Sequence, residues 1–200
     1  MKTYKLHLIR HGITEGNLNG QYIGRTELPL APSGVSAIKN LTEKIEYPNA
    51  QKIYSSPMLR CRQTAKIIYP EREISIVPDL IEYDFGEFEG KTANELENRP
   101  EYMEWAAGKR TSPPGGEDNQ DFTKRICVAI NTIVRDMMES DITDAAVVMH
   151  GGTIMTFLAA CGIPRQSTIQ WATDAGRGYT VMVTPSLYQR SGVVEVIDRI

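Results

Sequence analysis

The chain has few cysteines, and their number and spacing exclude two classes of protein. The three cysteines, Cys61, Cys127 and Cys161, are widely separated and form no CxxC pair. An odd, dispersed set predicts neither a disulfide framework nor a zinc site, and it is typical of a reducing compartment. Cys127 and Cys161 fall on apolar helical faces and are predicted to lie in the core. Cys61 is interpreted as structural, because no group that would activate its thiol is identified.

The sequence also lacks a strong charge bias and a long hydrophobic run. Its formal net charge is −3, which gives no reason to expect binding to nucleic acid or to an anionic membrane. No apolar run approaches the length of a membrane span, and Arg10 and His11 interrupt the first run before it could serve as a signal peptide. We therefore expect a cytoplasmic protein without a metal or another cofactor. The sequence fits a monomer and a homodimer equally.

Strand-like and helix-like segments alternate along the chain. After an opening strand that contains Leu6, Leu8 and Ile9, the patterns predict strands at 52–55, 74–77, 145–149, 180–183 and 193–197. Helices are predicted at 33–46, 56–69, 92–107 (one or two short helices), 122–137 and 154–161. Such alternation predicts an α/β protein, in which helices cover both faces of a largely parallel sheet in three layers. No linker or repeat divides the chain, so a single domain over residues 1–200 is expected.

Two of the predicted strands end in the same way. LIRHG (8–12) closes the first strand and VVMHG (147–151) closes a later one, so that His11 and His150 stand in matching positions. Ligands of open α/β sheets bind outside the carboxyl ends of strands, and we therefore expect the two histidines to face one pocket. His7 lies within the alternation of the first strand and is interpreted as structural.

Cationic and neutral donors are predicted to converge on the same pocket. Arg10 precedes His11 directly, and Arg60 lies in the first turn of a helix that we expect to begin with Ser56 as N-cap and Pro57 as first residue. Arg62 would point to another side. Further donors are Asn17 and the amides of Gly151 and Gly152. This set suits a phosphoryl group, with His11 as either a hydrogen-bond donor or a nucleophile. The alternative is a strand end whose Arg and His pair with surface carboxylates.

The chain resembles the histidine phosphatase (phosphoglycerate mutase-like) superfamily. The segments that carry the resemblance occur in the order of the family and cover most of the chain. They are RHGITEGN (10–17), YIGRTELPLAPSG (22–34), SSPMLRCRQTA (55–65), LIEYDFGEFEG (80–90), PPGGE (113–117) and VVMHGGTI (147–154).

The resemblance implies a phosphoglycerate mutase-like fold with a small cap from about 92–118, and it implies roles for individual residues. His11 becomes the nucleophile that forms phosphohistidine, and Glu82 becomes the proton donor to the leaving oxygen. The groups that hold the phosphoryl oxygens would be the side chains of Arg10, Asn17, Arg60 and His150, the Gly151 amide and the loop around Gly24. Thr14 and Glu15, which lie inside the motif RHGITEGN (10–17), would shape the phosphate loop.

The residues alone do not separate Glu82 from the three carboxylates that follow it in the segment 80–90. Asp84, Glu87 and Glu89 are interpreted as solvated side chains, which is the common role of acids in such a loop. A protonated carboxyl beside the phosphate would need a raised pKa, and a nearby phosphate dianion would raise it.

Within the family, GRTELPL and PPGGE look most like the α-ribazole phosphatase and broad-specificity phosphatase branch. That branch often has Asp, Thr and Ser where this chain has Glu27, Ala31 and Asp118. Phosphoglycerate mutases typically have Glu-Arg-His-Tyr-Gly where this chain has EYDFG (82–86), and their cap region is usually longer. The expected function is thus a metal-independent phosphomonoesterase that acts on a small phosphorylated metabolite, with α-ribazole 5′-phosphate as the named candidate.

Three alternatives of other kinds stand beside this expectation. The first is a 2,3-bisphosphoglycerate-dependent phosphoglycerate mutase. The second is a catalytically inactive module that binds phosphorylated ligands, although every chemical position is intact. The third, a metal-dependent hydrolase, is disfavoured because the two strand-end histidines are flanked by Arg and Gly instead of further ligands.

Overall fold

The apolar runs of the sequence pair into one seven-stranded sheet in the computed structural model, which describes residues 2–200. Across the sheet, the strands are β3 (Ile74–Ile76), β2 (Lys52–Ser55), β4 (Asp144–Met149), β1 (Tyr4–Arg10), β6 (Gly178–Val183), β7 (Val194–Arg199) and β5 (Gly162–Ile163). The pairs β3–β2, β2–β4, β4–β1 and β7–β5 are parallel, whereas β6 runs antiparallel to both of its neighbours. The prediction of a largely parallel sheet is therefore confirmed.

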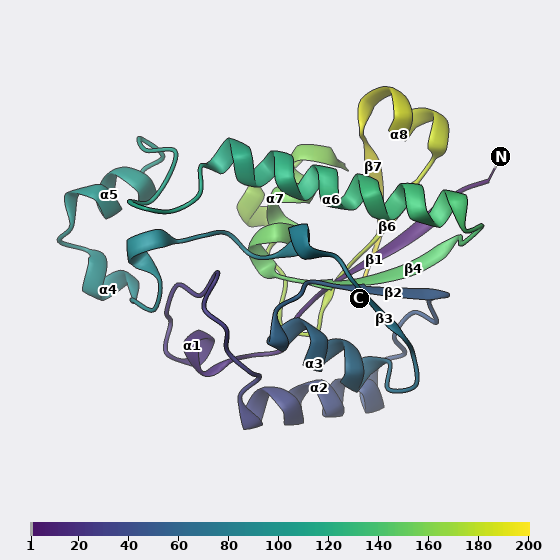
Figure 1. Cartoon of the computed structure of the whole chain (residues 1–200), viewed down its shortest axis with the longest axis horizontal. Helices are drawn as coiled ribbons and strands as arrows, with labels where there is room; N and C mark the ends of the chain where they lie inside the picture. The colour runs from purple at the N-terminus through teal and green to yellow at the C-terminus, as the bar shows by residue number, and fades with distance from the viewer. Residues whose placement is uncertain (1) are drawn as a thin grey trace.

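Helices cover the sheet on both faces (Figure 1). The longest, α6 (Asn119–Glu139), lies with α7 (Gly151–Cys161) on one face, and α2 (Pro32–Lys44) and α3 (Leu59–Ile68) lie on the other. The remaining helical segments are α1 (Glu15–Leu18), η1 (Pro78–Leu80), η2 (Gly86–Phe88), α4 (Ala93–Leu96), α5 (Pro100–Ala106), η3 (Thr168–Trp171) and α8 (Pro185–Ser191). The expected three-layer α/β/α arrangement is thus confirmed.

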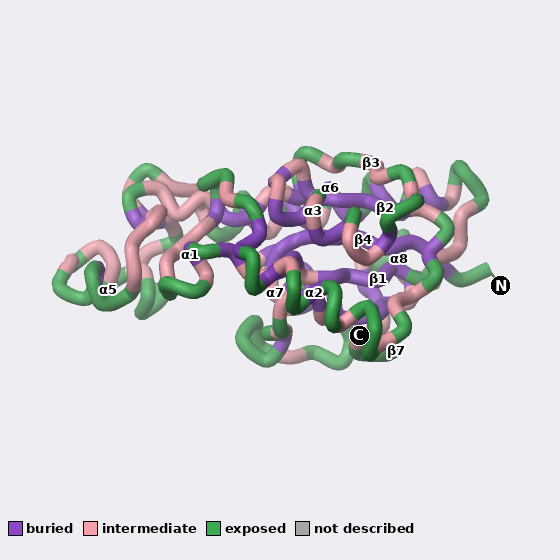
Figure 2. The backbone as a smooth tube through the Cα atoms, turned by 90° about the horizontal axis from the view of Figure 1, so that it is seen from below, coloured by how far each residue is buried: buried purple, intermediate pink, exposed green. Residues whose placement is uncertain are grey.

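The alternation of side chains along the strands divides the core into two parts, one on each face of the sheet. Leu6 and Leu8 of β1 pack into the larger part with α6 and α7, whereas Ile9 packs with Ile53 and with Cys61 of α3. Figure 2 shows the central strands β1 and β4 as largely buried segments, whereas the edge strand β3 is not buried. The prediction that Cys127 and Cys161 lie in the core is half right, because both are only partly buried and pack against its edge.

The structure corrects the predicted start of α3. The helix begins at Leu59 with Met58 as its N-cap, so Ser56 and Pro57 lie before it. The hydroxyl of Ser56 accepts from the amide of Met58 at 3.4 Å and also lies 2.8 Å from Nε2 of His150. The helix α8 was not predicted, although Pro185 in its first turn and Gly192 in the left-handed conformation after its end are ordinary boundary signals.

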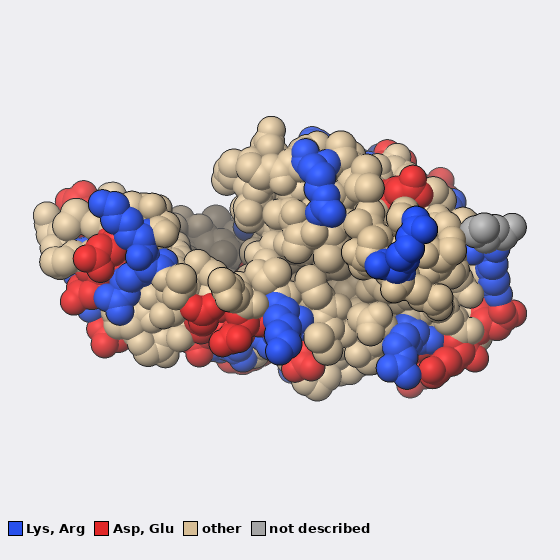
Figure 3. Space-filling model, turned by 90° about the horizontal axis from the view of Figure 1, so that it is seen from above, with Lys and Arg blue, Asp and Glu red and all other residues tan. Residues whose placement is uncertain are grey.

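Beyond the carboxyl end of β1, the chain forms a side lobe that contains α4 and α5 and lies beside α1 (Figure 1). Aromatic rings hold this lobe together: Trp105 of α5 contacts the rings of Tyr22, Tyr83, Phe85 and Phe88. The surface is hollowed between the lobe and the body of the molecule (Figure 3). Within residues 2–200, no helix combines the length and the apolar character needed to cross a membrane.

Candidate active site

His11 stands directly after β1 and is buried. Its Nδ1 lies 2.6 Å from the carbonyl oxygen of Gly12, which can only accept a hydrogen bond, so the ring carries its proton on Nδ1. Burial, followed by the charges of Arg60 and Arg10, lowers the pKa of His11 to about 3. The imidazole is therefore neutral at physiological pH, and Nε2 presents a free electron pair, as a nucleophile requires.

His150 follows β4 and faces His11, with the ring centroids 5.2 Å apart. Its Nδ1 accepts a hydrogen bond from Nε of Arg60 at 3.3 Å, so its proton lies on Nε2 and is donated to the Ser56 hydroxyl. Burial first, and then His11 and Arg60, lower the pKa of His150. The strand-end histidines thus meet as predicted, and His150 fixes the orientation of Arg60.

Arg60 is almost completely buried, and the loop 24–26 holds its guanidinium group. Nη2 donates to the carbonyl oxygen of Gly24 at 2.8 Å and Nη1 donates to that of Thr26 at 3.0 Å. A side chain at position 24 would collide with the structure, because a Cβ there would lie 1.7 Å from the carbonyl oxygen of Tyr83. Gly24 is therefore needed for close backbone approach, and it acts on the site through its carbonyl group.

Glu89 holds the same loop from the opposite side. Its carboxylate accepts hydrogen bonds from the amides of Gly24 at 3.0 Å and Arg25 at 2.7 Å, and from the hydroxyl of Thr26 at 2.7 Å. The peptide groups of the loop thus lie between a carboxylate at their N–H side and the Arg60 guanidinium at their C=O side. The prediction that Glu89 is a solvated acid is therefore wrong, because its carboxylate holds the loop 24–26.

Glu82 is the buried acid of the segment 80–90. Its two carboxyl oxygens accept hydrogen bonds from the amides of Tyr83 and Gly152, each at 2.9 Å. Burial raises the pKa of Glu82, against the opposing effects of these two amides and of Arg60 and Arg10. A Cβ at position 152 would lie 2.6 Å from the carboxyl group, so Gly152 leaves the space that Glu82 occupies.

Arg125 of α6 fixes the backbone on which Glu82 stands. Its Nη1 donates to the carbonyl oxygens of Asp79 and Ile81, both at 2.7 Å, while Nη2 pairs with Glu117 at 2.7 Å. Glu117 also lies 3.5 Å from Nη2 of Arg25, next to Gly24. The PPGGE segment therefore links the Glu82 loop to the loop that holds Arg60. Neither Arg125 nor the role of Glu117 was predicted from the sequence.

Arg10 completes the cationic side of the site. Its Nη1 donates to the carbonyl oxygen of Thr173 at 2.6 Å, and a Cβ at Gly151 would come within 3.2 Å of its Nε. Nε of Arg10 is buried and has no hydrogen-bond partner among residues 2–200. Because buried polar groups are nearly always paired, this N–H is a donor that a bound anion would satisfy.

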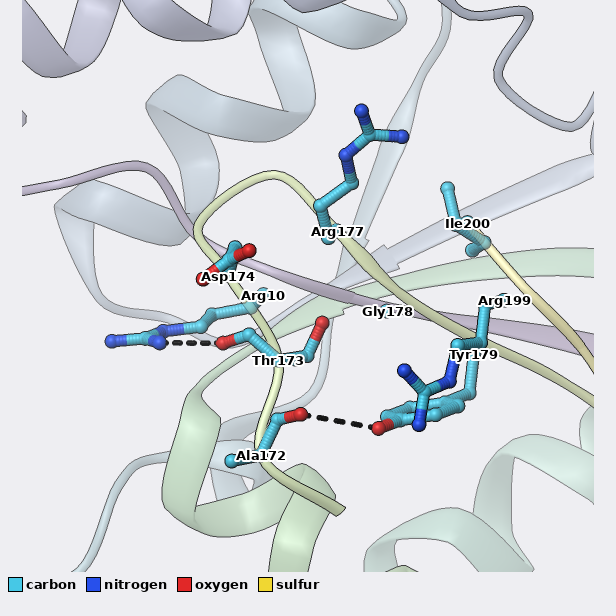
Figure 4. A pocket seen from close by; sticks show the side chains of 9 residues that line it. All are labelled: Arg10, Ala172, Thr173, Asp174, Arg177, Gly178, Tyr179, Arg199 and Ile200. Carbon is cyan, nitrogen blue, oxygen red and sulfur yellow. Dashed lines mark hydrogen bonds between the residues drawn. The ribbon is translucent and has the colours of Figure 1, made fainter. Parts of the chain in front are cut away.

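A cavity of about 420 Å³ opens next to Arg10 and is lined further by Arg177 and Arg199 (Figure 4). The three guanidinium groups point to different sides of this cavity, and Arg199 lies over the ring of Tyr179. The cations do not meet at one point there. The convergent group is the one formed by Arg10, Arg60 and the two histidines at the ends of β1 and β4.

Thr14 and Asn17 shape the turn after His11. Thr14 caps α1, and the side-chain oxygen of Asn17 accepts from both the amide and the hydroxyl of Thr14, at 3.1 and 3.0 Å. The amide oxygen of Asn17 is thereby occupied, so its NH₂ end is the part that can donate to an anion. Glu15 lies in the first turn of the same helix and is exposed.

The other candidate residues have local structural partners. Asp84 accepts from the amide of Gly86, and Glu87 pairs with Arg99 on the surface. His7 bridges Thr180 and Asp144, both at 2.9 Å, in accord with its structural interpretation. Arg62 is exposed, whereas Arg60 reaches the site. Within residues 2–200, no three His, Cys, Asp or Glu side chains are grouped as metal ligands would be.

In a comparison with known protein families, one family matches the part of the chain that contains all of these motifs. Residues 6–185 match the histidine phosphatase superfamily (branch 1). An adenosylcobalamin/alpha-ribazole phosphatase of Salmonella typhimurium is 30% identical over 160 residues, which cover 78% of either chain. A 2,3-bisphosphoglycerate-dependent phosphoglycerate mutase of Rhizobium etli is 26% identical over 97% of this chain and 94% of its own.

The fold has a counterpart among solved structures. The alpha-ribazole phosphatase from Shigella flexneri superimposes with a TM-score of 0.74 at 25% sequence identity, and the match covers 90% of each chain.

Proposed function

Because this chain belongs to the histidine phosphatase superfamily and is a phosphatase, we propose that it hydrolyses a small phosphomonoester through a phosphohistidine formed on His11. The observation that carries the proposal is the state of His11. Its Nδ1–H donates a hydrogen bond to the carbonyl oxygen of Gly12, and the low pKa of the imidazole leaves Nε2 unprotonated beside Arg10 and Arg60.

In the first step of the proposed reaction, Nε2 of His11 attacks the phosphorus and the bond from phosphorus to the ester oxygen breaks. Arg10 and Arg60 offset the charge on the transferring phosphoryl oxygens, with Asn17 and the Gly151 amide as neutral donors. Glu82, whose pKa is raised by burial, gives its proton to the leaving oxygen. An alkoxide leaves poorly without that proton.

In the second step, water attacks the phosphorus of the phosphohistidine and the bond from phosphorus to nitrogen breaks. Glu82 is now a carboxylate and takes the proton from the attacking water, which restores the acid. Inorganic phosphate is released, and His11 returns to its neutral form. His150 and the loop 24–26 act in both steps by holding Arg60 in place.

For the substrate we propose α-ribazole 5′-phosphate as the first compound to test, because the Salmonella relative carries that activity in its name. Two of the three departures from the branch pattern accept hydrogen bonds from amides at the starts of helices. Glu27 accepts from the amide of Leu59 at the start of α3, and Asp118 caps α6 through the amide of Gln120. Ala31 occupies the N-cap of α2 without a side-chain bond. The carboxylate of Asp118 is thus held by its hydrogen bond at the start of α6.

The mutase alternative is supported by the Rhizobium relative and requires retention of a bisphosphate. We propose that residues 92–118 act as a cap over the hollow, and two of its three cations, Arg99 and Arg110, already face carboxylates. Arg99 pairs with Glu87, and Arg110 lies 3.9 Å from Glu104. Arg25, at the edge of the site, pairs with Glu117. This favours hydrolysis over retention of a second phosphate.

The proposal is tested by phosphate release from p-nitrophenyl phosphate, α-ribazole 5′-phosphate and 3-phosphoglycerate, with EDTA present. The wild type is compared with His11→Ala, and isomerisation of 3-phosphoglycerate is followed separately. We expect release that resists EDTA and is lost in the variant. Isomerisation that outruns release would make the chain a mutase. Turnover abolished by EDTA would favour a metal-dependent hydrolase, and binding without turnover would favour the inactive module.

A further inference from the structure

Two helices on one face of the sheet bring two cysteines together. Cys127 lies in the middle of α6, and Cys161 is the last residue of α7. Their sulfur atoms are 3.7 Å apart, and 34 positions separate them along the chain. A disulfide has a sulfur–sulfur distance of about 2.05 Å, so the two sulfur atoms have to approach each other by about 1.6 Å to form a bond.

The pair is open to solution, which distinguishes it from the third thiol. Both residues are partly exposed and line a cavity of about 410 Å³ together with Lys124 and Tyr188. Lys124 places a cation in the same cavity, where it attracts an anionic thiol reagent. Cys61 is fully buried against His150, and burial raises the pKa of its thiol. Accessibility therefore selects Cys127 and Cys161 for thiol chemistry.

We propose that Cys127 and Cys161 form a reversible disulfide that joins α6 to α7, with a low-molecular-weight disulfide such as glutathione disulfide as the oxidant. This inference is independent of the proposed catalytic function. In a reducing compartment such a bond is transient and forms when the thiol pool is oxidised.

The exchange balances in two displacements. The Cys127 thiolate attacks one sulfur of glutathione disulfide, whose sulfur–sulfur bond breaks and releases one glutathione thiolate. Cys161 then loses its proton and attacks the Cys127 sulfur, which releases the second thiolate. The two protein sulfurs are oxidised, the two glutathione sulfurs are reduced, and the two protein protons end on the released thiolates. The hydrogen bond from the Cys161 thiol lowers the pKa of Cys127, which fits Cys127 as the first nucleophile.

The test equilibrates the folded wild-type chain in buffers with rising ratios of glutathione disulfide to glutathione. The remaining thiols are then alkylated after unfolding, and the peptides are mapped by mass spectrometry. We expect a linked peptide pair that contains Cys127 and Cys161, removed by dithiothreitol, with Cys61 recovered as an alkylated thiol. Cys127→Ser and Cys161→Ser should each abolish the linked pair and accumulate a mixed disulfide with glutathione.

A second measurement compares the melting temperatures of the oxidised and the reduced protein. Closing a loop of this length raises the melting temperature of the oxidised wild type by about 5–10 °C over the reduced protein, without a change in the serine variants. The proposal would be overturned by no linked pair at any ratio, by only glutathione adducts on the wild type, or by a distribution of pairings equal to that of the chain oxidised in denaturant. Pairs between molecules would do the same.

Discussion

Glu82 combines three properties that a general acid for a poor leaving group needs. It is buried, it is oriented by two backbone amides, and burial raises its pKa, so its protonated form persists to higher pH than that of a solvated glutamate. Proton donation contributes more to the rate when the leaving oxygen is more basic. The role of this one residue can therefore be separated from the rest of the site by changing the substrate.

We expect Glu82→Gln to reduce kcat/KM for an alkyl phosphate by roughly 10²–10⁴, and to reduce it far less for p-nitrophenyl phosphate. The p-nitrophenolate ion leaves without a proton, whereas an alkoxide does not. In the wild type, the ratio of the alkyl to the aryl rate should fall as pH rises through the raised pKa of Glu82. Equal losses on both substrates, or a ratio independent of pH, would remove Glu82 from the role of acid.

At the scale of the element, the loop 24–26 connects Glu89 to Arg60. Glu89 holds the amides of the loop, and the carbonyl groups of the loop hold the guanidinium group of Arg60. Replacing the Glu89 carboxylate leaves the amides of Gly24 and Arg25 without their acceptor and loosens the carbonyls that hold the guanidinium group. We expect Glu89→Ala to lower kcat/KM about 10–100-fold, and Glu89→Gln to lower it less, because one acceptor oxygen remains. Steady-state kinetics of the purified variants measures this.

The matched control is Glu87→Gln, two positions before Glu89 and within the short helix η2 that Glu89 follows. Glu87 is 57% exposed at its side chain and pairs with Arg99 on the surface, so its loss should leave kcat/KM unchanged. In combination with Arg60→Lys, Glu89→Ala should add little, since both act on the same guanidinium site. Fully additive losses would show that Glu89 supports the fold in general and not Arg60.

The sequence predicts best those elements whose signals are local. The strand-end motifs around His11 and His150 and the first-turn position of Arg60 follow from apolar runs, glycines and helix spacing. Glu89 could not be separated from Glu87, because its partners lie more than sixty positions away in the loop 24–26. Ser56 has the local signature of an N-cap and does accept from the amide of Met58, but its hydrogen bond with the distant His150 could not be predicted from this local pattern.

At the scale of the whole molecule, the fold class followed from alternation, but the direction of β6 did not. No crossover helix precedes β6, since the chain enters it from η3 and a turn, and this allows it to run antiparallel to β1. The buried histidines also affect the whole molecule, because their charged forms are excluded from the folded state.

We expect stability to fall as the pH decreases below about 6.5, where the unfolded chain binds protons that the folded His11 and His150 do not. Each such group contributes roughly 1.4 kcal/mol per pH unit until its folded pKa is reached, which for His11 is about 3. His11→Asn cannot titrate and should lose about 2 kcal/mol less than the wild type between about pH 7.5 and about pH 5. Urea unfolding at the two pH values measures the difference.

Variation of stability with pH that is the same in both proteins would mean that the pKa of His11 is the same in the folded and the unfolded state. The matched control is Arg62→Ala, whose exposed position predicts the wild-type pH dependence. A steeper decrease in His11→Asn than in the wild type would likewise contradict a lowered pKa for His11.

The most direct measurement is to trap the phosphorylated protein during turnover. The wild type is mixed with a radiolabelled phosphomonoester that it hydrolyses, quenched in alkali, where phosphohistidine is stable, and mapped by peptide. The label should be found on the peptide that contains His11, be lost in acid, and be absent from His11→Asn. Steady hydrolysis without label on His11, or turnover that survives in His11→Asn, would contradict a phosphohistidine mechanism in this protein.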